Sequence, residues 1–136
     1  MGSLTFFFDR CTGSVVPKRL RHLRAPFEIE FHDEKKHGFD QDEDDDAWLA
    51  VVSQKDWVVV SHDKRFHQDS AAIEAVRQHG GRVFYLDGGG SVKWDKLRRF
   101  VACYRRIRKI VEQQKPPYIY LIGYNDRILR QRGFDD

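Results

Sequence analysis

The sequence predicts an α/β fold in which a mostly parallel five-stranded sheet is covered by helices on both faces. Short apolar segments alternate with segments of helical periodicity along the chain. The best of the apolar segments are apolar throughout, as strands buried on both faces are. Gly, Pro and Asp separate the segments, and these residues favour turns. Alternation of this kind is typical of parallel strands joined by crossover helices.

The first predicted strand is residues 4–8, an aromatic-rich run that ends at Asp9. Pro17 suits the first turn of a short amphipathic helix that follows. Residues 27–31 alternate strictly between apolar and acidic side chains. Phe27, Ile29 and Phe31 should therefore face the core from a second strand.

The next helix is predicted around residues 47–52, with Asp44 or Asp45 available to cap its start. Residues 57–60 (Trp-Val-Val-Val) are the clearest buried strand of the chain. Asp69 or Ser70 can open another helix, which should end at Gly80 and Gly81 because glycine readily adopts the left-handed conformation at helix C-termini.

The last elements are two strands, 83–86 and 118–122, on either side of a long amphipathic helix from about 91 to 114. Apolar residues recur in that helix at spacings of three and four, which places Trp94 and Tyr104 on its core-facing side. Two consecutive prolines, Pro116 and Pro117, end the helix.

The size of the chain limits it to one domain. With 136 residues, a second core would be marginal; we expect a single domain over residues 1–123 and a charged C-terminal extension over 124–136. No apolar run is long enough to cross a bilayer and no secretory signal begins the chain. Two cysteines are too few for a disulfide scaffold. We expect no membrane association and a cytoplasmic location.

Charge is distributed unevenly. The chain has a formal net charge of +3, yet residues 28–46 are strongly acidic and residues 93–115 strongly basic. Clustered Lys and Arg side chains attract phosphates, so nucleic acid is a candidate partner, although basic helices also occur simply as solvated surfaces.

Three aspartates mark a candidate metal site. Asp9 ends the first strand, Asp63 follows the third, and Asp45 lies at the start of the intervening helix. Parallel strands and the helices between them bring these positions to one edge of the sheet. Converging carboxylates favour a hard cation such as Mg²⁺ or Mn²⁺, which suits phosphodiester hydrolysis. Taken singly, each aspartate also fits a turn or a helix cap.

Two motifs resemble the PIN domain. Residues 45–50 (Asp-Asp-Ala-Trp-Leu-Ala) followed by 57–66 (Trp-Val-Val-Val-Ser-His-Asp-Lys-Arg-Phe) look like its Asp-led helix, strand and Asp-containing turn, and residues 6–11 resemble its opening strand in the compact PIN-like branch. The resemblance covers about residues 4–87. It implies a three-layer α/β/α domain with strand order 3-2-1-4-5.

The resemblance also implies a function. PIN-like proteins are generally Mg²⁺- or Mn²⁺-dependent endoribonucleases, and many small bacterial ones are VapC-type toxins neutralised by a protein antitoxin. Asp9, Asp45 and Asp63 would be the catalytic, metal-binding acids. RNA would contact Lys64 and Arg65, which directly follow Asp63, and next Arg10. A homodimer is left open.

The sequence departs from the family pattern in its fourth acid. Relatives usually carry one in a helix between the first strand and the Asp-led helix; here Asp46 is assigned to the metal, with Asp42 and Asp44 as alternatives. Arg10 stands where compact relatives often have another acid. If the fourth ligand is absent, the alternative function is a catalytically silent module that binds nucleic acid or protein.

Four histidines, His32, His37, His62 and His67, have no zinc-site spacing. We expect them in turns or at the surface, with only His62 near substrate.

Overall fold

The computed structural model describes residues 4–9, 12, 14–32, 37–38, 45–61, 69–86, 93–123 and 125–131. Its elements alternate as the sequence predicts. In chain order they are β1 (Thr5–Phe8), α1 (Val15–His22), β2 (Glu28–Phe31), α2 (Asp45–Gln54), β3 (Val58–Ser61), α4 (Ser70–His79), β4 (Arg82–Leu86), α5 (Lys93–Gln113), β5 (Tyr118–Ile122) and β6 (Ile128–Arg130).

The strands form one sheet in the order β2-β1-β3-β4-β5-β6. The first five of these are parallel to their neighbours, and β6 runs antiparallel to β5. The prediction of a mostly parallel sheet is confirmed. The strand count of five is wrong, because Ile128–Arg130, in the segment expected to be a C-terminal extension, adds a sixth strand.

The predicted order 3-2-1-4-5 also needs correction. That order requires two strands between β1 and α2, and the described residues hold only β2 in this interval. β2 is therefore the edge strand, and the sheet grows on its other side through β5 and β6. The adjacency of β1 and β3, on which the predicted site depends, is present.

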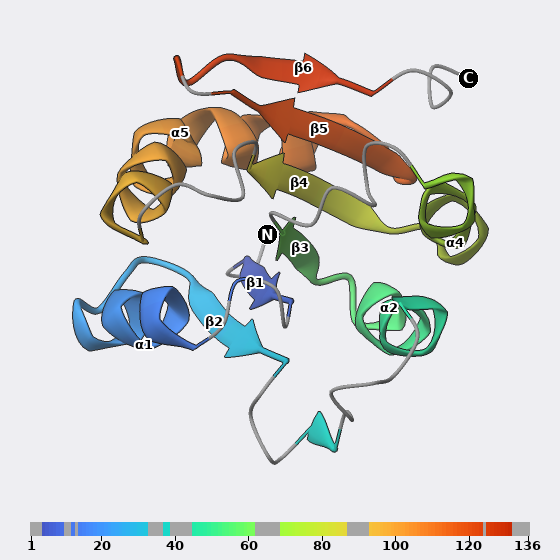
Figure 1. The fold of residues 1–136 in the computed structure, drawn as a ribbon, viewed down its shortest axis with the longest axis horizontal. Helices are drawn as coiled ribbons and strands as arrows, with labels where there is room; N and C mark the ends of the chain where they lie inside the picture. The colour runs from blue at the N-terminus through green and yellow to red at the C-terminus, as the bar shows by residue number, and fades with distance from the viewer. Residues whose placement is uncertain are drawn as a thin grey trace.

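Helices cover both faces of the sheet, which confirms the three-layer α/β/α architecture. Figure 1 shows α1 and α5 on one face and α2 and α4 on the other. Alternation along β1 divides its side chains between two cores: Phe6 and Phe8 pack in the core beneath α1 and α5, and Phe7 packs in the core beneath α2 and α4.

The ends of α4 agree with the sequence prediction. The Asp69 carboxylate caps the helix by accepting a hydrogen bond of 2.8 Å from the Ala71 backbone N–H, and Gly80 follows the helix with φ +69°. None of the helices within the described ranges is both long and apolar enough to cross a membrane.

The core-facing side of α5 differs from the prediction. Its buried apolar residues are Phe100, Cys103 and Ile107, whereas Trp94 is 71% exposed. The prediction for Trp94 is wrong because spacings of three and four fit two adjacent stripes of a helix, and contact with the sheet selects one of them. Tyr104 does pack against the core, as expected.

Candidate active site

The candidate site lies where the chain changes direction in the sheet. From β1 the chain passes first to β2 on one side and then to β3 on the other. In open parallel sheets, ligands bind outside the carboxyl ends of the strands at such a point. Phe8 is paired with Phe31 of β2 and with Val60 of β3.

Three polar residues follow these paired positions. The Asp9 N–H donates to the Val60 carbonyl at 3.2 Å, and the His32 N–H donates to the Phe8 carbonyl at 2.9 Å. The ladder therefore continues one residue beyond the apolar core, and His32, Asp9 and Ser61 form a polar row across β2, β1 and β3. All three are buried.

The Asp9 carboxylate is held by hydrogen bonds on both oxygens. The Ser61 hydroxyl donates to Oδ2 at 2.5 Å, and the Thr12 backbone N–H donates to Oδ1 at 3.3 Å. The Thr12 hydroxyl donates to the Asp9 carbonyl at 2.6 Å. Only 3% of Asp9 is exposed. With one donor on each oxygen, the direction of the carboxyl group is fixed.

The start of α2 lies at the same edge of the sheet. α2 ends at Gln54 and β3 begins at Val58, so the C-terminus of α2 meets the amino edge and its first residue, Asp45, returns to the carboxyl edge. The helix is docked by Trp48, whose ring stacks on Phe7 with centroids 5.5 Å apart. The positions of the Asp45 and Asp46 side chains lie outside the described part of the structure.

Several predicted site residues fall outside the described residues: Arg10, Asp42, Asp44, His62, Asp63, Lys64 and Arg65. Ser61 is in contact with Asp9 and precedes Asp63 by two residues, so the chain enters this segment beside Asp9. Among the described side chains, no group of three or more His, Cys, Asp or Glu residues could hold a metal ion. Asp9 is thus the one predicted ligand whose side-chain position is known, and its carboxylate oxygens suit a hard cation.

Sequence reasoning missed Ser61 and His32. A serine that closes an otherwise apolar strand was the available signal for Ser61. His32 was expected in a turn or at the surface, but it is only 1% exposed and lies against the Phe7 and Trp48 rings, with centroids 6.5 and 6.4 Å away. The alternation of β2 places His32 with exposed Glu28, and the docking of α2 is what buries it.

His37, which was also expected in a turn or at the surface, is largely buried. Its side chain is 8% exposed, with Nε2 3.0 Å from the Glu30 carboxylate. The ring packs near Phe7 and Trp57, at centroid distances of 6.0 and 5.6 Å. The chain near residue 37 therefore covers the same face of β2 as Trp48 does.

Part of the chain matches a protein-family model. The model described as a PIN-like domain matches residues 4–88, well over half of the chain, from just before β1 to just after β4. No curated protein and no solved structure matches the chain.

Proposed function

We propose that this chain, which belongs to the PIN-like domain family, is a metal-dependent endoribonuclease that hydrolyses phosphodiester bonds. PIN-like domains are in general nuclease-type modules. The finer assignment depends on one observation: a buried aspartate at the carboxyl end of β1, with each carboxylate oxygen accepting a hydrogen bond.

This geometry suits a metal ligand. A carboxylate fixed by Ser61 and Thr12 is already oriented before a cation binds, so little ordering is needed on binding. We propose that Asp9, Asp45 and Asp63 hold Mg²⁺ or Mn²⁺, with Asp46 as the fourth acid. A bound cation at such a site supplies Lewis-acid stabilisation of the phosphate and lowers the pKa of a bound water.

The roles of the chain's own residues follow from their positions. Asp9 would hold the cation, while the Ser61 hydroxyl and the Thr12 N–H would orient the Asp9 carboxylate. Lys64, Arg65 and Arg10 are proposed to contact the RNA backbone, because each is close in sequence to a proposed ligand. The toxin role, the antitoxin and the homodimer depend on the resemblance alone and stay predictions, as does the cytoplasmic location.

Cleavage of a labelled single-stranded RNA tests this function. The protein should cleave in Mn²⁺ or Mg²⁺ and stop in EDTA. Asp9→Asn should lower kcat/KM at least about 100-fold, since about 2.7 kcal/mol of transition-state stabilisation would be lost. Asparagine keeps the size of the side chain. Its oxygen can still accept from the Thr12 N–H, and its NH₂ group can donate to the Ser61 hydroxyl oxygen in place of the lost Ser61 hydrogen bond.

Asp56→Asn is the matched control. Asp56 lies beyond the opposite end of β3, its side chain is 79% exposed, and its φ of +59° is one that asparagine tolerates. This variant should cleave like the wild type. Cleavage that persists in EDTA or in Asp9→Asn would contradict the proposal, and RNA binding without any cleavage would favour the silent binding module.

A further inference from the structure

Two lysines lie at the start of α5, in line with its buried stripe: Lys96 is half-buried and Lys93 is exposed. The buried stripe runs through Phe100, Cys103 and Ile107, and extending it backwards by helical spacings of three, four and seven reaches Lys93 and Lys96. Apolar residues are expected there. The lysines also lie in the first turn, where the helix dipole disfavours cations. The helix dipole therefore does not account for the two lysines.

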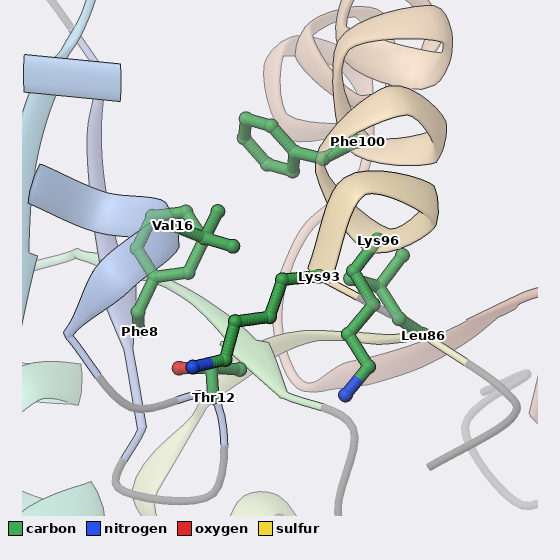
Figure 2. Close-up of a pocket in the computed structure, with 7 residues that line it drawn as sticks. All are labelled: Phe8, Thr12, Val16, Leu86, Lys93, Lys96 and Phe100. Atoms are coloured by element: carbon green, nitrogen blue, oxygen red, sulfur yellow. The ribbon is translucent and has the colours of Figure 1, made fainter. Parts of the chain in front are cut away.

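Both lysines line a cavity between α1 and α5. Its other walls are Phe8 and Leu86, which end β1 and β4, together with Thr12, Val16 and Phe100. Figure 2 shows both lysine side chains extending from the first turn of α5 to the side of the cavity where Thr12 lies, with Phe100 on the opposite side. The cavity of about 70 Å³ has room for roughly five to seven waters at roughly 10–15 Å³ each.

The cavity shares Thr12 with the candidate active site. Thr12 lines the cavity, and its backbone N–H lies 3.3 Å from Asp9 Oδ1. Phe8, another wall residue, is the immediate neighbour of Asp9 in β1. A group bound in the cavity would therefore touch Phe8, which precedes Asp9 in sequence, and Thr12, which is hydrogen-bonded to Asp9.

The chemistry of the walls selects a ligand that is both anionic and ring-containing. Two ammonium groups and the N-terminus of α5 attract a phosphate, and the apolar walls with Phe100 suit a flat ring. Unstacked bases of single-stranded RNA are commonly bound against aromatic side chains. A nucleotide combines both features.

We propose that this cavity binds the nucleotide next to the cleaved phosphodiester, with its base against Phe100, Leu86 and Val16 and its phosphate on Lys93 and Lys96. This inference rests on the proposed ribonuclease function and adds to it a substrate-positioning pocket on the other face of the sheet from Asp9.

Titration calorimetry in EDTA with uridine 5′-monophosphate, uridine and inorganic phosphate tests the pocket without catalysis. The monophosphate should bind more tightly than either fragment. Lys93→Ala/Lys96→Ala should weaken monophosphate binding at least about tenfold, and in RNA cleavage it should raise KM about tenfold with little change in kcat. Alanine at these positions favours the helix, so the fold should be retained.

Arg105→Ala/Lys109→Ala is the matched control. It removes the same charge from the exposed side of α5, roughly 14 and 20 Å beyond Lys96 at 1.5 Å per residue, and should bind the monophosphate and cleave RNA within about twofold of the wild type. Equal losses in both double variants would overturn the pocket in favour of general electrostatic attraction. Unchanged monophosphate binding in the lysine variant would overturn it outright.

Asp9→Asn separates this inference from the proposed function, because it should lower kcat/KM for RNA cleavage at least about 100-fold and keep monophosphate binding. Lysine-dependent monophosphate binding without any RNA cleavage would contradict the nuclease and leave the pocket standing. Cleavage that depends on Asp9 but has the same KM in the double lysine variant would contradict the pocket and support the nuclease.

Discussion

At the carboxyl end of β1, different residues follow the buried core on the two faces of the sheet. On the face covered by α2 and α4, the polar row of His32, Asp9 and Ser61 follows the core, and its carboxylate is buried and hydrogen-bonded. On the face covered by α1 and α5, Phe8 closes the core and a cavity with two lysines follows. One face carries a fixed carboxyl group and the other carries two lysines.

The alternation of a single strand explains this difference. Successive side chains of β1 point to opposite faces, so Phe8 and Asp9 are neighbours in sequence but belong to different layers. Thr12 connects them, because it bonds Asp9 and also lines the cavity. The proposed cation site and the proposed phosphate site would thus lie beside the same strand end, on opposite faces of the sheet.

The largest expected contrast between the faces concerns two tryptophans. Trp48 is 1% exposed and docks α2, whereas Trp94 on α5 is 71% exposed. Trp48→Ala should lower the free energy of unfolding by about 3–5 kcal/mol, and Trp94→Ala should change it by less than about 0.5 kcal/mol. Urea denaturation measures both. Similar losses for the two variants would mean that α5 depends on Trp94 for packing.

A pair of histidines gives the next contrast. His32 is buried against Phe7 and Trp48, and His22 at the end of α1 is exposed. His32→Ala leaves a cavity in the face that carries Asp9, so it should destabilise the protein by about 1–3 kcal/mol. His22→Ala is the control and should have an effect within about 0.5 kcal/mol. A His32 variant as stable as the wild type would show that α2 does not cover β2 in solution.

Ser61→Ala should give the smallest of these effects, measured in catalysis by the face that carries Asp9. Loss of the 2.5 Å hydrogen bond to Asp9 should reduce kcat about tenfold, equivalent to about 1.4 kcal/mol, with KM unchanged. The double lysine variant should show the opposite division between kcat and KM.

Ser61→Thr keeps the hydroxyl and should restore most of the Ser61→Ala loss, which a purely structural role for Ser61 would not require. A Ser61→Ala protein that cleaves like the wild type would remove Ser61 as a positioning residue for Asp9.

Much of this protein was determined by sequence alone. Apolar runs and periodicity located five strands and the helices between them, and Asp69 and Gly80 marked the ends of α4, because these signals act through the local backbone. The position of Asp9 at a strand end also followed from the sequence, since a polar residue after a buried run must lie at an edge of the core.

Tertiary structure decided the remainder. β6 is only three residues long and forms by pairing with β5, so its local signal is weak. The burial of His32 and the exposure of Trp94 depend on which helix stripe meets the sheet. The cavity with Lys93 and Lys96 unites residues from β1, α1, β4 and α5. Such features arise from contacts between residues distant in sequence, and local patterns constrain those contacts only to a set of alternatives.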